Sequence, residues 1–297
     1  MPREAPHPIR KKEMSPEKVI FDIGSNNGDD LPYYLKKCDR VVAIEANPAL
    51  CEIIRKRFFS EIKTGRLIVE NFVLTTDESA SGVVCFHLHR TNHVLSQFPK
   101  PEKPEDFERV FLPCLPLPDL IKRHGMPHYV KIDVEHYDAE ILRAMFSRGI
   151  FPQYISTESH GVVPFCLLAG SGQYHAFKLV DGPTVAQKYH HYRITVGSTS
   201  EKYSFPNHSA GPFGEDLSGD WMTAEDFLKV IAMKGPGHWD IHASLLDPAD
   251  PQKSRQELNS QIRAIFSDKA CYFLKRYWFL KWLTLRRYLF NWVQGIR

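Results

Sequence analysis

The sequence lacks several features that would place it in a specialised class of protein. Its six cysteines form no CxxC pair and no regular spacing, which indicates reduced thiols in a cytosolic protein. No window of 18 uncharged apolar residues occurs, so no transmembrane helix is expected. The basic start of the chain is followed by no apolar stretch, so we also expect no signal peptide. A net charge of +3 is too small to indicate nucleic-acid binding by itself.

What the chain does contain is an alternation of apolar runs and helix-like segments over its first 160 residues. Strands are predicted at 18–23, 40–46, 65–74, 82–89, 128–134 and 152–159, and helices at 29–37, 48–62 and 137–149. Strands separated by helices imply βαβ units, and therefore an α/β fold with a doubly wound, mostly parallel sheet. Ligands bind such sheets at the carboxyl ends of the strands, which directs attention to 24–28, 45–48, 71–77, 133–136 and 158–160.

The domain organisation follows from the change in composition along the chain. We expect a flexible arm over residues 1–15 and a catalytic domain over 16–245, with a cofactor half at 16–160 and cap or substrate elements at 161–245. A polar connector is predicted at 246–262, and an aromatic, basic helix at 263–297. Residues 91–113 are polar and rich in proline, which predicts a surface loop.

The segment "FDIGSNNGDD" at residues 21–30 predicts a nucleotide-type turn. A buried strand ends in Asp22, and glycines at 24 and 28 let the backbone approach a ligand closely. Glu45 ends the next strand, where a carboxylate can accept hydrogen bonds from both hydroxyls of a ribose. A tight turn that binds no ligand is the alternative.

The charge of this turn distinguishes two classes of ligand. A dinucleotide fingerprint requires GxGxxG and places a pyrophosphate at the helix N-terminus. This loop reads GSNNG and continues with Asp29 and Asp30, which would repel a pyrophosphate. The same two carboxylates are compatible with S-adenosylmethionine, because that molecule carries a sulfonium and an ammonium group.

Three segments together resemble the FkbM family of S-adenosylmethionine-dependent methyltransferases, which have a class I, Rossmann-like fold. They are "VIFDIGSNNGDD", "VVAIEANP" and "VKIDVEHYDAEIL", and the resemblance covers roughly residues 18–160. It implies an S-adenosylmethionine cofactor held by Asp22, Gly24, Ser25, Asn26, Gly28, Glu45, Ala46 and Asn71. The family usually has Val-Glu-Gly where this chain has Val134-Glu135-His136, and this departure concerns the substrate side.

Methyl transfer to a hydroxyl requires alignment of the acceptor and a general base. The candidates at the strand ends are Asp133, Glu135, Glu158 and His160. Each also has a structural alternative as a helix cap, an ion-pair partner or an ordinary polar residue at a strand end. We assign no metal site, although Asp133, Glu158 and His160 together could ligate a hard cation.

Two loops are candidates for contact with the substrate. Asn92, His93 and Ser96 can reach a cleft from the segment "RTNHVLSQF" at 90–98. The segment 209–222 contains glycines, acids and Trp221, a composition that suits a lid or a sugar-facing loop and equally a structural Ω-loop.

The end of the chain, residues 271–297, contains nine aromatic residues, six Lys or Arg and no acid. On a helical wheel the basic residues Lys275, Arg276, Arg286 and Arg287 share one arc, and most of the large apolar residues lie opposite. This pattern is typical of an amphipathic helix at a membrane surface. Packing on the protein itself or in a homodimer is the alternative, and nucleic acid is the least favoured partner.

The sequence therefore predicts a cytoplasmic S-adenosylmethionine-dependent O-methyltransferase, peripheral at the inner face of the membrane if the C-terminal helix binds lipid. The resemblance implies an acceptor hydroxyl on a sugar, glycan or natural product. An NAD(P)-dependent oxidoreductase and a catalytically inactive cofactor-binding or membrane-associated protein are the alternatives.

Overall fold

The computed structural model describes residues 17–76, 82–196, 198–207, 209–235, 237, 239–246 and 249–267. The arm expected over residues 1–15 lies outside the described residues. The same is true of the expected C-terminal helix beyond residue 267.

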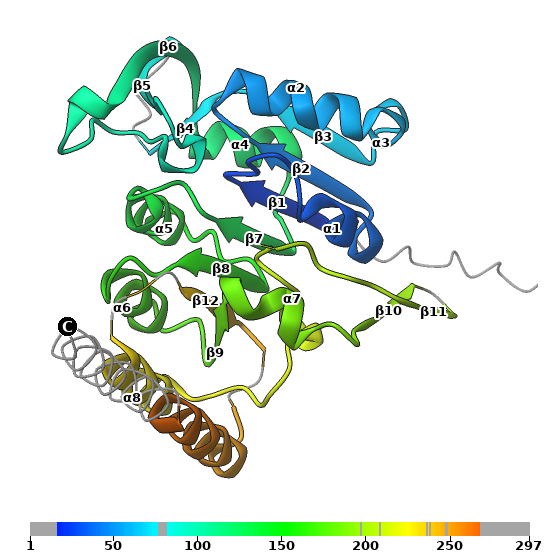
Figure 1. Cartoon of the computed structure of the whole chain (residues 1–297), viewed down its shortest axis with the longest axis vertical. Helices are drawn as coiled ribbons and strands as arrows, with labels where there is room; N and C mark the ends of the chain where they lie inside the picture. The colour runs from blue at the N-terminus through cyan, green and yellow to red at the C-terminus, as the bar shows by residue number, and fades with distance from the viewer. Residues whose placement is uncertain are drawn as a thin grey trace, which may run out of the picture.

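Seven strands form the main sheet, in the order β3-β2-β1-β7-β8-β12-β9 (Figure 1). All neighbours pair in parallel except β12, which runs antiparallel to both β8 and β9. The sequence prediction of an α/β fold with a mostly parallel sheet is confirmed. The strands are β1 Val19–Ile23, β2 Arg40–Ile44, β3 Leu67–Glu70, β7 Tyr129–Ile132, β8 Tyr154–Glu158, β9 Ala176–Asp181 and β12 Trp239–Ser244.

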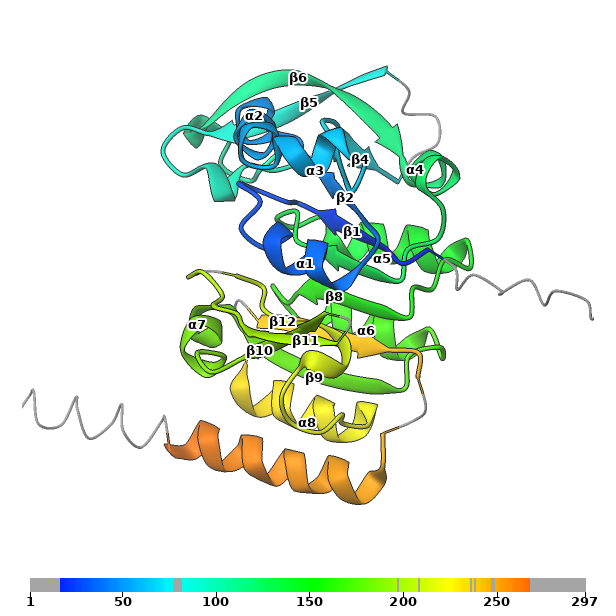
Figure 2. The ribbon, with the colours of Figure 1, turned by 90° about the vertical axis from the view of Figure 1, so that its right-hand side faces the viewer.

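Helices cover both faces of this sheet, which explains why β1 and β7 are buried along their whole length (Figures 1 and 2). On one face α4, α5, α6 and α8 pack in a core with Phe21, Val130 and Phe177. On the other, α1, α2 and α7 pack around Tyr33 and Tyr129. The helices are α1 Leu31–Lys37, α2 Pro48–Arg57, α3 Phe59–Lys63, α4 Leu117–His124, α5 Asp138–Ser147, α6 Val163–Gly170, α7 Val185–Lys188 and α8 Ala224–Lys234.

A small second sheet, β4-β6-β5, lies at the end of the molecule that carries α2 (Figure 2), and it corrects two sequence predictions. The strand predicted at 65–74 is divided between β3 and β4 Val73–Thr75, which belong to different sheets. The loop predicted at 91–113 is in part a strand, because β6 Phe107–Pro116 pairs along the whole of β5 Gly82–His89. The remainder of that segment contains the short 3₁₀ helices η1 His93–Leu95 and η2 Pro104–Asp106. Val73, Phe86 and Leu112, one from each strand of this sheet, form a small buried cluster on which Phe98 of the proline-rich segment packs.

Residues 161–245 supply two strands of the main sheet, β9 and β12, so the sheet joins the two expected parts 16–160 and 161–245. Between β9 and β12 lie η3 Gly182–Thr184, α7, the hairpin β10 Arg193–Val196 and β11 Thr199–Lys202, η4 Gly214–Asp216 and α8.

Residues 251–267 are helical, which corrects the connector predicted at 246–262. This helix lies beside α8 in both views (Figures 1 and 2). Leu258 and Ile265 are buried in the core, and Ser254 donates to the Asp226 carboxylate at 2.7 Å. The polar composition of the segment reflects its solvent-facing side, and its few apolar residues hold it on the protein. Within the described residues, no helix is long and apolar enough to cross a membrane.

Candidate active site

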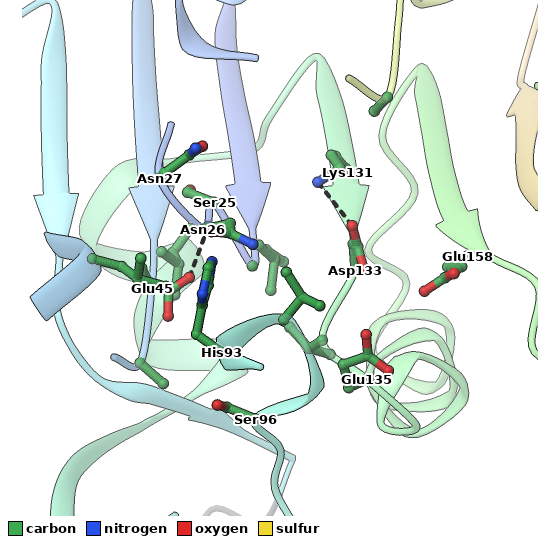
Figure 3. A pocket seen from close by; sticks show the side chains of 18 of the residues that line it. Ser25, Asn26, Asn27, Glu45, His93, Ser96, Lys131, Asp133, Glu135 and Glu158 are labelled. Carbon is green, nitrogen blue, oxygen red and sulfur yellow. Dashed lines mark hydrogen bonds and ion pairs between the residues drawn. The ribbon is translucent and has the colours of Figure 1, made fainter. Parts of the chain in front are cut away.

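A cavity of about 780 Å³ opens at the carboxyl ends of β1, β2, β7 and β8 (Figure 3). Parallel strands place their carboxyl ends at one edge of the sheet, so the loops that follow them converge there. Eight of the residues predicted from the sequence line this cavity: Gly24, Ser25, Asn26, Glu45, Ala46, Asp133, Glu135 and Glu158. Among the described residues, Asp22, Gly28, Asn71 and His160 do not line it.

The loop after β1 presses against the end of β7. Gly24 has φ +85°, and a Cβ placed there would lie 1.8 Å from the carbonyl oxygen of Asp133. Asn26 is also left-handed, with φ 49°, a conformation that asparagine tolerates better than most residues. The loop is closed by Ser25, whose hydroxyl donates to the carbonyl of Asp22 at 2.7 Å. Glycine is therefore required at position 24, because a side chain would collide with the backbone of Asp133. Without a side chain at this position, the backbone of the loop faces the cavity.

Glu45 fixes the loop after β2 to the glycine loop. Its carboxylate accepts the backbone N–H of Asn26 at 2.8 Å and that of Asn47 at 2.7 Å. Burial raises the pKa of Glu45 to about 7, although the two N–H donors oppose the shift. Each carboxylate oxygen retains acceptor capacity beyond these bonds, so Glu45 can still receive the hydroxyls of a ribose.

Asn71 has a supporting position behind this loop. Its amide donates to the carbonyl of Glu45 at 3.0 Å and to that of Ala46 at 2.9 Å. These bonds orient the segment that carries Glu45. Asn71 therefore orients the loop after β2 from outside the cavity.

Lys131 is the centre of a buried charge cluster between β1 and β7. Its ammonium lies 3.1 Å from Asp133, 3.8 Å from Asp22 and 3.9 Å from Asp30. Burial lowers the pKa of Lys131, but the surrounding carboxylates outweigh it and raise the pKa well above its usual value. Burial raises the pKa of Asp22 to about 6, against the effect of Lys131. Burial likewise raises the pKa of Asp240 on β12 well above its ordinary value.

Sequence reasoning singled out Asp133 but missed the role of Lys131 and Asp240. Lys131 was not among the predicted site residues, and its nearest carboxylate is that of Asp133. The sequence does indicate a role for Lys131, because a lysine within the buried strand "YVKI" needs a partner of opposite charge. Asp240 had no such signal, since β12 joins the site only through the long connection from β9.

At the opposite end of the cavity from Glu45, the carboxylates of Glu135 and Glu158 lie on the same side (Figure 3). Nε2 of His160 is 3.0 Å from Glu158 and 3.7 Å from Glu135. The hydrogen bond to Glu158 raises the pKa of His160 to about 9, opposed by burial and assisted by both carboxylate charges. Glu135 and His136 are left-handed, with φ 47° and 65°, so the chain turns sharply just beyond β7.

Two loops over the cavity bear on the predictions of substrate contact from segments 90–98 and 209–222. Asn92, His93 and Ser96 line the cavity, and His93 is on the side of Glu45 (Figure 3). From the predicted lid at 209–222, Ser209 lines the cavity, while its hydroxyl donates to Asp30 at 2.5 Å. Trp221 is directed elsewhere: it stacks on Tyr154, so the prediction that it faces the substrate is not supported by this geometry.

Carboxyl groups outnumber basic groups in the lining of the cavity, although burial raises the pKa of Glu45 and of Asp240. Seven carboxyl residues line it, and among the described residues Lys131 is the sole Lys or Arg of the lining. The seven are Asp29, Asp30, Glu45, Asp133, Glu135, Glu158 and Asp240. Of the two acids expected to repel phosphate, Asp29 pairs with Arg57 at 2.9 Å and Asp30 lies near Lys131. The wall as a whole still disfavours an anionic ligand and favours a cationic one.

The chain is similar to several solved methyltransferase structures, at low identity. Precorrin-6Y C5,15-methyltransferase from Geobacter metallireducens GS-15 is 12% identical with a TM-score of 0.34, over 78% of this chain and 81% of that one. The C-terminal domain of the same enzyme from Rhodobacter capsulatus is 11% identical with a TM-score of 0.36, over 80% and 83%. The METTL16 MTase domain is 10% identical with a TM-score of 0.37, over 80% and 63%. Scores of this size support no inference about this chain.

The sequence itself gives the assignment. No curated protein matches the chain. Residues 22–165 match the family model described as the methyltransferase FkbM domain, a range that includes the glycine loop, Glu45 and the whole Glu135–His160 region. Residues 22–165 therefore form a methyltransferase FkbM domain, as the three sequence motifs predict, and the chain is an S-adenosylmethionine-dependent methyltransferase.

Proposed function

We propose that the protein binds S-adenosylmethionine in this cavity and transfers the methyl group to a hydroxyl oxygen of a sugar, glycan or natural product. The observation that carries the proposal is the cavity wall, where seven carboxyl residues face a single lysine. Such a wall complements a ligand with a sulfonium and an ammonium group and disfavours the pyrophosphate of NAD.

The residues present fit the proposed cofactor at two places. Glu45 offers carboxylate oxygens to ribose hydroxyls, and Asn26, whose side-chain oxygen has no hydrogen-bond partner, lies beside it. The carboxylates around Lys131 can receive the ammonium group, because a single lysine cannot neutralise them all. Bound S-adenosylmethionine supplies an activated methyl group, so the protein has to align the acceptor and take up a proton.

The acceptor end of the cavity is formed by Glu135 and Glu158, opposite Glu45 (Figure 3). Because its pKa is about 9, His160 carries a proton at neutral pH and is therefore a poor proton acceptor there. This leaves the carboxylates of Asp133, Glu135 and Glu158 as the proton-accepting groups. The same carboxylates can accept hydrogen bonds from the hydroxyls of a polyhydroxylated acceptor.

Calorimetry tests the cofactor directly. We expect heat of binding from S-adenosylmethionine and none from NAD, and the reverse result would contradict the proposal. Incubation with a labelled methyl donor and a panel of glycans and metabolites, followed by mass spectrometry, tests the acceptor. A label found only on nitrogen or carboxylate groups would retain the methyltransferase and reject O-methylation.

We further propose that residues 271–297 bring this enzyme to the cytoplasmic surface of a membrane. The support is the sequence pattern of aromatic and basic residues, because these residues lie outside the described part of the chain. Membrane contact would suit an acceptor that is linked to lipid. A homodimer formed through the same segment is the second candidate.

A further inference from the structure

A second set of chemically related side chains lies at the acceptor end of the cavity. Glu135, Glu158 and His160 each direct one ligating atom into a common space, and these atoms are all within 4.8 Å of one another. Two carboxylate oxygens and an imidazole nitrogen form a ligand set that divalent cations use in proteins. This set differs from the alternative raised by the sequence, since Glu135 takes the place of Asp133.

The local backbone holds Glu135 in this position at a conformational cost. Both Glu135 and His136 have left-handed φ values, a conformation that is unfavourable for residues other than glycine. Without that turn, the alternation of β7 would direct the side chain of residue 135 differently. The ring of His136 lies 4.7 Å from that of His160, centroid to centroid, and packs against it. The turn thus brings a third ligating group to Glu158 and His160.

An independent observation comes from Asp138, at the start of α5. Its side chain is 3% exposed, and neither carboxylate oxygen accepts a hydrogen bond from another residue. Burial raises the pKa of Asp138 to about 7, and the charge of His160 opposes that shift. A buried carboxylate without a donor is unfavourable unless a positive charge lies nearby.

We infer that Glu135, Glu158 and His160 form a binding site for a divalent cation of the Mn²⁺ class, with Asp138 as a buried carboxylate behind the ligands. The mixture of oxygen ligands and one imidazole favours such a cation over Ca²⁺, which prefers oxygen alone. On binding, His160 gives its Nε2 proton to solvent and its neutral nitrogen becomes the ligand.

The role of this cation rests on the proposed function, although its binding does not. Glu135 and Glu158 line the cavity that holds the acceptor, so the cation would contact an acceptor hydroxyl. A divalent cation lowers the pKa of a bound hydroxyl and fixes its orientation. It would therefore assist loss of the hydroxyl proton, for which Asp133 remains as the acceptor when Glu135 and Glu158 bind the cation.

Electron paramagnetic resonance with Mn²⁺ tests the site, because the signal of free Mn²⁺ decreases on binding. The full chain is first stripped with EDTA and transferred to buffer free of chelator. We expect the wild type to bind Mn²⁺, and Glu158→Gln and His160→Gln to weaken binding by more than about tenfold. The matched controls Glu52→Gln and His175→Gln change exposed residues away from the cavity and should bind as the wild type does.

If the wild type leaves the signal of free Mn²⁺ unchanged, the inference is overturned, whether or not the variants bind Mn²⁺. Binding that persists in folded Glu158→Gln and His160→Gln chains would overturn it as well, with circular dichroism as the check of folding. Calorimetry with S-adenosylmethionine in the absence of metal separates the two proposals. Heat from the cofactor without Mn²⁺ binding rejects the cation site alone, and Mn²⁺ binding without such heat rejects the proposed function.

Discussion

The α-carbon of Gly24 faces the carbonyl oxygen of Asp133 so closely that a Cβ on residue 24 would lie 1.8 Å from it. This contact joins the two loops that form the cofactor end and the centre of the cavity. Because the opposing group is backbone, it cannot move aside without displacing the end of β7.

The first prediction concerns Gly24→Ala. The substitution adds a steric clash to the strain of a left-handed alanine, so we expect it to lower the free energy of unfolding by more than about 3 kcal/mol. Denaturant unfolding measures the change. Binding of S-adenosylmethionine should be lost together with the stability.

Gly65→Ala is the matched control. Gly65 has φ +75°, but a Cβ there meets nothing within 4 Å. In that variant only the strain of a left-handed alanine lowers stability, and we expect the free energy of unfolding to decrease by about 1 kcal/mol. Equal losses for the two variants would show that contact with Asp133 is unimportant.

The second prediction concerns Lys131→Met. Removal of the ammonium leaves Asp22, Asp30 and Asp133 without their shared counter-charge, which should cost about 3–5 kcal/mol at pH 7.5. Burial already raises the pKa of Asp22 to about 6 and that of Asp30 above its usual value. A carboxyl with a raised folded-state pKa stabilises the fold at low pH and loses that contribution as the pH increases through that value.

The destabilisation of Lys131→Met should therefore be smaller at pH 5 than at pH 8, as measured by unfolding at both values. Lys36→Met is the control, since Lys36 forms an exposed pair with Glu201 and should cost less than about 1 kcal/mol. A pH-independent loss in Lys131→Met would indicate that the lysine contributes through packing alone.

The third prediction concerns Glu45 and the pH dependence of cofactor binding. Burial raises the pKa of Glu45 to about 7, and its ionised form is the better acceptor for ribose hydroxyls. Affinity for S-adenosylmethionine should therefore increase by up to about tenfold between pH 6 and pH 8. Calorimetry at several pH values measures this slope.

Glu45→Gln should lose about tenfold to a hundredfold in affinity at pH 8, because the bonds to a charged acceptor are weakened. Protonation of the free ligand affects binding to both proteins equally. The difference between their pH dependences of affinity is therefore due to Glu45. If the variant keeps the full slope of the wild type, Glu45 does not contact the ribose as proposed.

The fourth prediction concerns residues 271–297. We expect the full chain to float with vesicles that contain phosphatidylserine, and to dissociate from them at high salt, because part of the attraction is electrostatic. A chain that ends at residue 267 should remain unbound. The cut is placed there because Ile265 is buried in the core, and an earlier cut would disturb the fold.

Equal flotation of the two chains would reject the membrane proposal. Size-exclusion chromatography without lipid then tests the remaining alternative, which is a homodimer formed through residues 271–297. A dimer that forms only with the full chain would assign the segment to self-association.

The sequence by itself determined the parts of this protein that depend on local pattern. Mostly apolar runs predicted β1, β2 and β7, because strands buried on both faces are rich in apolar residues. The spacing of the glycine loop and Glu45 predicted where a cofactor binds, since both follow directly from the ends of neighbouring strands. The aromatic and basic pattern of the C-terminus remains a prediction of this kind.

Tertiary structure decided the features that depend on contacts between distant segments. β12 pairs with β8 and so brings Asp240 to the cavity. This pairing joins strands about 80 residues apart, and no local pattern in the sequence indicates it. The same holds for Asn71, which turns from the cavity to the carbonyls of residues 45 and 46. The grouping of Glu135 with Glu158 and His160 required the left-handed turn after β7, a conformation that side-chain identity does not encode for glutamate. Local patterns specify which face of an element is buried, whereas the partners that it meets are fixed only when the chain is packed.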